Sequence, residues 1–329
     1  MKKVLLIISA FVGTACIAQN NHAYKVAKTF HISSPGGWDY IAVNNNRVYV
    51  SHGTQVNVLD ESTGDSIGYI PNTNGVHGIA FIDHLNKGYT SNGRSNNVTV
   101  FDLKTNQVLG QIPTGENPDA IMYEPNTKTI ITCNGRSNNL SVIDPEQNKV
   151  VATISVGGKP ETAVSNEAGK LYVNIEDKNE IVEVDLKNHT VINRWSLSPT
   201  EGPTGLAYDK NTRRLFAGCE KQLVVLNAEN GKVVDRLPIG NGCDGVAFDD
   251  RKKIVYTSNG EGTITAIREN SADKYSVLGN YPTKRGARTI AIDEKTGTLF
   301  LPTADFEAAT GANERPKMKP GTFQVLVVE

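Results

Sequence analysis

The sequence is poor in cysteine, in net charge and in long apolar runs, and each shortage excludes a class of protein. Four cysteines among 329 residues are too few for a disulfide-stapled scaffold, so the core must come from packing. Lys plus Arg (34) almost balance Asp plus Glu (35), which leaves a net charge of −1 and no general basic field for nucleic acid. Beyond the N-terminal run, no segment is apolar enough to span a membrane.

Several catalytic and cofactor motifs are absent as well. No Gly-x-Ser-x-Gly elbow, phosphate-binding loop, His-Glu-x-x-His or Cys-x-x-Cys-His occurs in the chain. The last absence argues against a c-type haem, and we predict no cofactor. No stretch has a helical period, which excludes a solenoid of helical repeats.

Residues 1–18 have the pattern of a secretory signal peptide. A Lys-Lys pair precedes the apolar run 4–12, and small residues then lead to Ala18. The run is shorter than the ~20 residues that cross a bilayer as a helix. We predict cleavage after Ala18 and export of residues 19–329 to the periplasm or the medium.

Cys16 offers an alternative for this end of the chain, in which it is the lipidated residue of a lipoprotein. Gly13 disfavours that alternative, because a lipoprotein signal normally has a large aliphatic residue there. After cleavage an odd number of cysteines remains, so at least one thiol is free or forms an intermolecular bridge. They are Cys133, Cys219 and Cys243.

A pair of small or apolar residues recurs seven times along the mature chain. The first members lie 38, 42, 42, 43, 40 and 44 residues apart, a period of about 42. A polar turn, a short apolar run and two alternating runs follow in a repeating order. The pairs are Ile41-Ala42, Ile79-Ala80, Ile121-Met122, Ala163-Val164, Leu206-Ala207, Val246-Ala247 and Ile290-Ala291.

Alternation with period two, bounded by turn residues, predicts β-strands. Residues 98–102 and 140–144 alternate in this way, and turns of the Asp-x-x-Thr/Asn kind follow such runs. Four strands in a repeat of this length predict a propeller blade. We therefore predict an all-β fold over residues 19–329: a single seven-bladed β-propeller with four-stranded blades.

The two ends of the chain support a closed ring. The seventh repeat ends one strand short, after the run 323–328. A spare strand, Tyr24–Ile32, precedes the first repeat. If this strand completes the last blade, the ring closes and no long edge is left unpaired.

Three runs resemble the YVTN-type repeat of the exported YncE-like seven-bladed propellers. They are Lys170-Leu171-Tyr172-Val173-Asn174, Val142-Ile143-Asp144 and the run 151–157. The resemblance covers essentially the whole mature chain and implies the fold. It implies little about chemistry, because these propellers have varied roles and a fold does not determine function.

The hexapeptide Asn-Gly-Arg-Ser-Asn-Asn occurs twice, at 92–97 and 134–139, which are 42 residues apart. Each copy follows the second strand of its blade, in blades two and three. We expect its Asn-Gly pair to supply the positive-φ residues that such hairpins favour. The alternative to a structural turn uses Arg94 and Arg136, which would lie on adjacent blades of one face and could contact a ligand.

A second set of polar residues stands two positions before each small-apolar pair. These residues begin the innermost strands, so we expect them to encircle the mouth of the central channel on what we term the upper face. With the histidine neutral, their formal charge is −4 + 1 = −3, and close carboxylates raise one another's pKa or recruit a cation. The set is Asp39, His77, Asp119, Glu161, Thr204, Asp244 and Arg288.

Other side chains should lie near the same mouth. Trp38 and His52 belong to blade one, and the ends of second strands add Glu176, Glu220 and Asp305. Cys219 and Cys243 also map to this face and could pair, which would leave Cys133 free. The ligand-binding residues that we predict are Trp38, Asp39, His52, His77, Arg94, Asp119, Arg136, Glu161, Asp244 and Arg288.

Three interpretations of this mouth stay open. It could be a hydrated funnel, a binding site for a polar ligand, or a metal or catalytic site. His52 and His77 with Asp39 and Asp119 have the donor types for a divalent ion, but they lack tight ligand spacing, and we predict no metal. For hydrolysis, His77 would be the general base, a neighbouring carboxylate would orient it, and Arg288 would stabilise an oxyanion.

Other features are weaker signals. Gly36-Gly37-Trp38 is expected to be a turn into blade one, and His84 and His189 fall in turns of the opposite face. Blade seven carries about twenty residues between its second and third strands, from Thr303 to Thr322. A hairpin needs two to five residues there. This segment is either a lid or partner-docking loop, or a plain surface loop.

We therefore expect an exported, monomeric binding protein. Its upper channel mouth would receive a polar small molecule, a peptide or a partner protein. The alternative is a hydrolase, lactone-type or metal-dependent, that uses the same mouth. Nucleic acid is not an expected partner, because acidic residues line the mouth beside Arg94 and Arg136.

Overall fold

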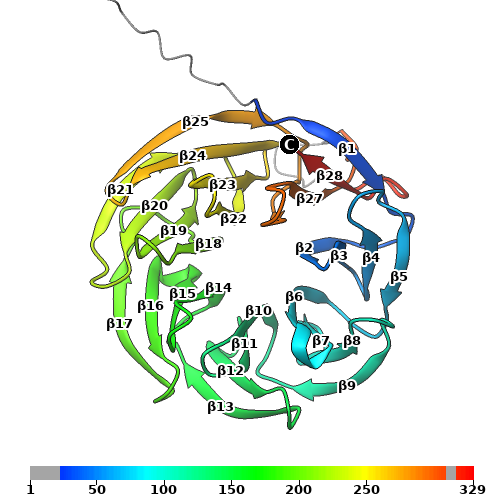
Figure 1. Ribbon diagram of the computed structural model, residues 1–329, viewed down its shortest axis with the longest axis horizontal. Coiled ribbons are helices and arrows are strands. Elements are labelled where there is room, and N and C mark those ends of the chain that lie inside the picture. Colours follow the sequence, from blue (N-terminus) through cyan, green and yellow to red (C-terminus); the bar gives the residue numbers. More distant parts are fainter. Residues whose placement is uncertain (1–22, 309–315) are drawn as a thin grey trace, which may run out of the picture.

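Seven four-stranded antiparallel sheets are arranged around a central axis in the computed structural model of the protein (Figure 1). The structure describes residues 23–308 and 316–329. The predicted all-β seven-bladed propeller is confirmed. The predicted signal peptide lies outside the described residues.

In blades one to six the strand order follows the chain from the axis outward, as the alternating runs predict. Blade one consists of β2 (Trp38–Asn44), β3 (Arg47–His52), β4 (Gln55–Asp60) and β5 (Ser66–Ile70). Blade two consists of β6 (Val76–Ile82), β7 (Lys87–Asn92), β8 (Asn97–Asp102) and β9 (Val108–Pro113). Blade three consists of β10 (Pro118–Glu124), β11 (Thr129–Asn134), β12 (Asn139–Asp144) and β13 (Lys149–Ser155).

The later blades repeat this pattern. Blade four consists of β14 (Pro160–Ser165), β15 (Lys170–Ile175), β16 (Glu180–Asp185) and β17 (Thr190–Ser196). Blade five consists of β18 (Leu206–Asp209), β19 (Arg214–Cys219), β20 (Gln222–Asn227) and β21 (Val233–Pro238). Blade six consists of β22 (Cys243–Asp249), β23 (Ile254–Asn259), β24 (Thr263–Ser271) and β25 (Lys274–Pro282). Two short 3-10 helices, η1 (Asp83–Leu85) and η2 (Glu176–Lys178), lie in connections of blades two and four.

Blade seven is built from both ends of the chain. Its order is β26 (Ala291–Ile292), β27 (Leu299–Thr303), β28 (Gln324–Val328) and β1 (Val26–His31) from the axis outward. β1 pairs antiparallel with β28, with Phe30 opposite Val325. The predicted closure of the ring by the N-terminal strand is therefore confirmed.

The core lies between neighbouring blades, because each sheet is buried on both faces by its neighbours. Seven apolar clusters fill these interfaces. The cluster at the closing seam contains Phe30 and Phe300 of blade seven and Val50 of blade one. β1 thus contributes packing as well as backbone hydrogen bonds to the closure.

The repeated hexapeptide is a hairpin loop, as predicted, but its turn geometry differs from the prediction. The left-handed residues are the fifth in each copy, Asn96 (φ 52°) and Asn138 (φ 54°), and not the glycines. In the second copy, buried Asn134 donates hydrogen bonds to Asn139 Oδ1 and Ser141 Oγ, each at 2.8 Å. The hexapeptide therefore recurs because its asparagines fasten the second strand of a blade to the third.

Candidate functional site

The ring residues predicted from the sequence converge at one mouth of the channel because the inner strands are bulged there. The register shifts between Trp38 and Ile41 in β2 and between Val76 and Ile79 in β6. The corresponding segments of β10, β14 and β22 are bulged too. A bulge interrupts the ladder and changes the direction of a side chain, and five ring residues lie in these bulges: Asp39, His77, Asp119, Glu161 and Asp244.

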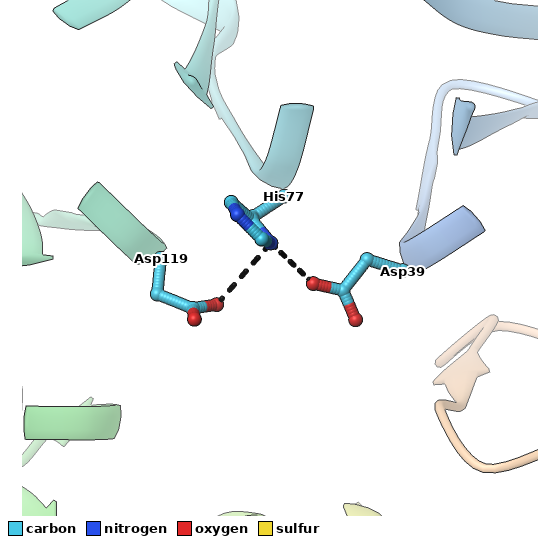
Figure 2. Close-up of side chains that lie close together, drawn as sticks. All are labelled: Asp39, His77 and Asp119. Atoms are coloured by element: carbon cyan, nitrogen blue, oxygen red, sulfur yellow. Dashed lines mark hydrogen bonds and ion pairs between the residues drawn. The ribbon is translucent and has the colours of Figure 1, made fainter. Parts of the chain in front are cut away.

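His77 of blade two stands between two carboxylates (Figure 2). Its Nδ1 is 2.5 Å from Asp39 Oδ2 of blade one and 3.8 Å from Asp119 Oδ1 of blade three. A single N–H donates well to only one of them, and Asp39 takes that hydrogen bond. Asp119 is 8% exposed, and its Oδ1 has no hydrogen-bond partner among the residues that the structure describes.

Glycine at position 93 lets the His77 ring take this place. A Cβ at Gly93 would lie 2.6 Å from His77 Nε2 and 2.8 Å from Asn117 Oδ1. The Nε2 edge of the imidazole therefore faces the first hexapeptide loop, whereas the Nδ1 edge faces the two carboxylates. The second copy has no such constraint, since the nearest atom to a Cβ at Gly135 would be 3.4 Å away.

Arg288 extends the cluster across the closing seam. Its Nε donates to Asp244 Oδ2 of blade six at 2.5 Å, and its Nη2 donates to Asp39 Oδ1 at 3.3 Å. Asp39 thus accepts hydrogen bonds from Arg288 and His77 with different oxygens. The result is one connected row of side chains from five blades: Asp119, His77, Asp39, Arg288 and Asp244.

Blade four contributes a separate ion-pair group. Lys159 Nζ is 3.1 Å from Glu161 Oε2 and also contacts Glu176 of η2. Glu176 was expected near the mouth from its place after β15. Thr204, the ring member of blade five, is uncharged and donates to the carbonyl of Cys243 at 2.8 Å. The charged part of the mouth therefore has a gap at blade five.

Burial and mutual repulsion change the acidity of these groups. Burial raises the pKa of Asp119 to about 6, although the neighbouring His77 opposes the shift. Burial and the charge of Asp119 raise the pKa of Glu161 to about 8 despite Lys159. Burial alone would lower the pKa of His77, but its hydrogen bond to Asp39 and the surrounding carboxylates raise it. These are the effects expected of carboxylates held close together away from water.

Tyr40 is partly buried close to the carboxylates of this mouth. It belongs to β2 of blade one, yet it packs against the apolar cluster shared by blades three and four. Its side chain therefore reaches past blade two to the interface of blades three and four. Burial raises the pKa of Tyr40 well above its usual value, and the charges of Asp119 and Glu161 contribute further.

Two predicted residues of blade one lie beside the mouth in the packed interior. His52 is fully buried, its Nδ1 is 2.7 Å from Ser34 Oγ, and its Nε2 is 2.8 Å from the Gly36 carbonyl. Its ring stacks on Phe323 at 4.0 Å. Both nitrogens are occupied, so the structure does not place His52 with His77 as a potential ligand. Burial lowers the pKa of His52, which favours a neutral ring.

Trp38 packs against the base of the long loop of blade seven. Its ring lies 5.3 Å from that of Phe323 and 6.0 Å from that of Phe306. Phe306 forms an isolated bridge with Met318, and Lys284 pairs with Asp305. Both described ends of this loop are therefore anchored beside blade one, on the face that carries the ring.

The remaining predicted residues lie farther out. Arg94 and Arg136 are exposed in the corresponding loops of blades two and three, on the same face as the ring. Glu220 is exposed after β19. The structure therefore brings Arg94 and Arg136 to one face but not into the connected row.

The three cysteines of the described residues are free and buried. The alternative in which Cys219 pairs with Cys243 is not formed in this structure. Burial raises the pKa of all three thiols, that of Cys219 to about 12. They are therefore unsuited to act as nucleophiles.

A cavity of about 740 Å³ occupies the other half of the channel. The inner strands of the blades form its wall. Small side chains on these strands leave the space open: Ala42, Ala163, Ala207, Ala247 and Ala291. The cavity opens opposite the ring, near the ion pair of Lys210 with Glu167 (3.3 Å). Because it contains none of the ring residues, we assign the candidate site to the upper mouth.

Two residues of the mouth were missed from the sequence. Tyr40 directly follows the ring residue of blade one, where the other blades have Gly78, Ala120, Thr162, Gly205, Gly245 and Thr289. Lys159 stands two positions before Glu161, where no other blade has a charged residue. Each is the exception at its position in the repeat, and that signal could have found both.

Comparisons with known proteins identify the fold class. No protein-family model matches the chain, and no curated protein matches it. Among solved structures, a chain of hydrazine synthase from Kuenenia stuttgartiensis is similar, with a TM-score of 0.73 and 17% identity over 82% of this chain and 94% of that chain. At this identity the similarity shows the fold alone. The chain is a seven-bladed β-propeller, and its place among YncE-like proteins stays a prediction.

Within the described part of the chain, no helix has the length and apolarity required to cross a membrane.

Proposed function

We propose that the protein is an exported binding protein that receives a small, positively charged polar ligand at its upper channel mouth. The observation that carries this proposal is the connected row of side chains from Asp119 to Asp244. Five blades each supply one side chain to it. A β-propeller serves as a scaffold for binding or for catalysis, so the site must decide between them.

The charge of the mouth favours a cation. Five carboxylates lie in the row and in the ion-pair group of blade four, against two permanent cations, Lys159 and Arg288. With His77 neutral and every carboxylate ionised, the formal balance is 2 − 5 = −3, and a bound cation would favour the ionised forms of Asp119 and Glu161, whose pKa values are raised. An ammonium or guanidinium group would offset part of this charge in a setting shielded from water, where such contacts are strong.

The test uses 1,4-diaminobutane and spermidine as probes. Isothermal titration in the presence of a chelator should show saturable binding to the purified protein, weakened at least tenfold in Glu161→Gln and in Asp244→Asn. Glu167→Gln, at the opposite opening, is the matched control and should bind as the wild type does. Equal affinity in all four proteins, or no binding to the wild type, would refute the proposal.

Export is part of the proposal and rests on the pattern of residues 1–18. Expression of the full chain in a bacterial host followed by mass spectrometry should give a mature N-terminus at Gln19. A cytoplasmic product that retains residues 1–18 would contradict export without affecting the ligand site.

The second candidate is a hydrolase. Asp39 contacts both His77 and Arg288, which brings together the groups expected for base and oxyanion partner. However, Nε2 of His77 faces Gly93, and Asp39 occupies Nδ1. In this arrangement the imidazole would have to give up its contact with Asp39 before Nδ1 could take a proton from water at the mouth. Lactone turnover that is lost in His77→Gln would favour the hydrolase.

A further inference from the structure

We propose that Asp39, His77 and Asp119 bind one divalent transition-metal ion at the upper mouth. This inference rests on the proposed function, because it names an ion as one cationic ligand of that mouth. One nitrogen and two carboxylate oxygens, all within 4.8 Å of one another, are the ligand atoms. Figure 2 shows the imidazole nitrogen turned toward both carboxylates.

One of the three separations, that between His77 and Asp119, suits a metal ion better than it suits hydrogen bonding. Metal–ligand bonds of about 2.0–2.2 Å place neighbouring ligand atoms roughly 3–4 Å apart. The separation between His77 Nδ1 and Asp119 Oδ1 is 3.8 Å, which is too long for a hydrogen bond and within that range. The hydrogen bond between His77 and Asp39 would have to lengthen by a small amount to admit the ion.

Asp119 provides an independent indication of a ligand. Asp119 is 8% exposed, and its buried Oδ1 points toward His77 without a hydrogen-bond partner among the described residues. A buried carboxylate oxygen without a partner is costly. A metal ion bound to His77 Nδ1 would supply the missing partner, and it would bind the lone pair that the imidazole presents when its proton is on Nε2.

The surroundings determine what kind of ion fits. One imidazole nitrogen with two carboxylate oxygens is a mixed donor set, which suits Zn²⁺, Mn²⁺, Fe²⁺ or Co²⁺ better than Mg²⁺ or Ca²⁺. Three protein ligands leave coordination positions open toward the channel mouth. Arg288 holds the other oxygen of Asp39 at 3.3 Å, which fixes the orientation of that carboxylate.

The experiment is a metal titration of the chelator-stripped, purified full chain by calorimetry, with Co²⁺ absorption as a second readout. We expect one equivalent of Zn²⁺ or Co²⁺ to bind, with visible Co²⁺ bands, and Mg²⁺ to bind at least a hundredfold more weakly. Asp119→Asn should weaken Zn²⁺ affinity at least tenfold, and His77→Gln should abolish the Co²⁺ bands. Asp250→Asn at the opposite face is the control and should bind as the wild type does.

The outcomes separate this inference from the proposed function. No one-equivalent site in the wild type, or equal Zn²⁺ affinity in folded Asp119→Asn and His77→Gln, would overturn the metal site. Thermal melts of each variant show whether it is folded. If the polyamines still bind in chelator while Zn²⁺ does not, the metal inference fails and the proposed function stands. If Zn²⁺ binds and the polyamines do not, the metal site stands and the organic ligand class is wrong.

Discussion

Arg288 and Asp39 form an ion pair across the seam where the last blade meets the first, with Arg288 Nη2 3.3 Å from Asp39 Oδ1. The same guanidinium donates to Asp244 of blade six. One side chain therefore joins three blades at the channel mouth, on the inner side of the closure that β1 makes at the rim (Figure 1). The ring closure is therefore stabilised at the channel by the ion pair of Arg288 with Asp39, and at the outer edge of blade seven by the pairing of β1 with β28.

Arg288→Ala should lower the free energy of unfolding by about 1 kcal/mol near pH 7. The Arg288 side chain is 40% exposed, so water weakens the pair, but its loss leaves two carboxylates close together without their cation. Urea denaturation measures the change. Arg94→Ala, an exposed arginine of the same face, is the control and should change stability by less than about 0.5 kcal/mol. Equal values for both variants would show that the seam does not depend on this ion pair.

The two copies of the hexapeptide allow a matched comparison of Gly93→Ala with Gly135→Ala. A Cβ at Gly93 would force the His77 ring to move, whereas a Cβ at Gly135 meets nothing closer than 3.4 Å. Neither glycine has a positive φ, so backbone strain is not added. Gly93→Ala should lower the free energy of unfolding by about 1–2 kcal/mol, and Gly135→Ala should be close to neutral. Thermal melts give the stabilities, and equal losses would contradict the assigned role of Gly93.

Glu269→Gln should stabilise the protein above pH 7 and have little effect at pH 4. Glu269 is 5% exposed and accepts a hydrogen bond from Thr212 at 2.8 Å. Burial, with Asp209 nearby, raises its pKa from 4.5 to about 7. The folded state therefore binds a proton that the unfolded state releases between these two values, so stability falls as the pH rises through this window.

Glutamine removes that loss, because it stays neutral at every pH. At about 1.4 kcal/mol for each pKa unit, the gain at pH 8 should be about 1–3 kcal/mol. Denaturation curves at pH 4 and pH 8 supply the measurement, and the acid value serves as the internal control. A gain of the same size at both pH values would mean that packing, and not ionisation, is responsible.

Cys133, Cys219 and Cys243 should be unreactive toward a thiol reagent in the native protein and fully reactive in denaturant. All three are free and buried, and burial raises the pKa of each thiol. A colorimetric thiol count of a protein that comprises residues 19–329 should rise from none to three on unfolding. A count of one in denaturant would show that Cys219 and Cys243 form a disulfide in the purified protein.

Much of the fold could be predicted from local patterns. The repeat of about 42 residues, the alternation within each repeat and the spare N-terminal strand together predicted seven blades and their closure. The ring positions were found in the same way, because two residues before each small-apolar pair is a fixed place in a blade. Asp39, His77, Asp119 and Asp244 do meet at one mouth.

The sequence was less informative about individual side chains. His52 was expected near the mouth, but its two ring nitrogens form hydrogen bonds with Ser34 Oγ and the Gly36 carbonyl inside the blade. The glycines of the hexapeptide suggested positive φ, whereas Asn96 and Asn138 adopt it. Tyr40 packs against the cluster of blades three and four, and nothing local to β2 shows this partner.

The sequence by itself determined the strand pattern, the number of blades and which residues begin the inner strands, because each of these follows from spacing along the chain. Only the tertiary structure decided that His77 stands between Asp39 and Asp119, that Arg288 joins Asp39 to Asp244, and that Tyr40 of blade one packs against blades three and four. These contacts join residues 38 to 249 positions apart. They depend on bulges and on the curvature of a closed ring, and no local period in the sequence records either of them.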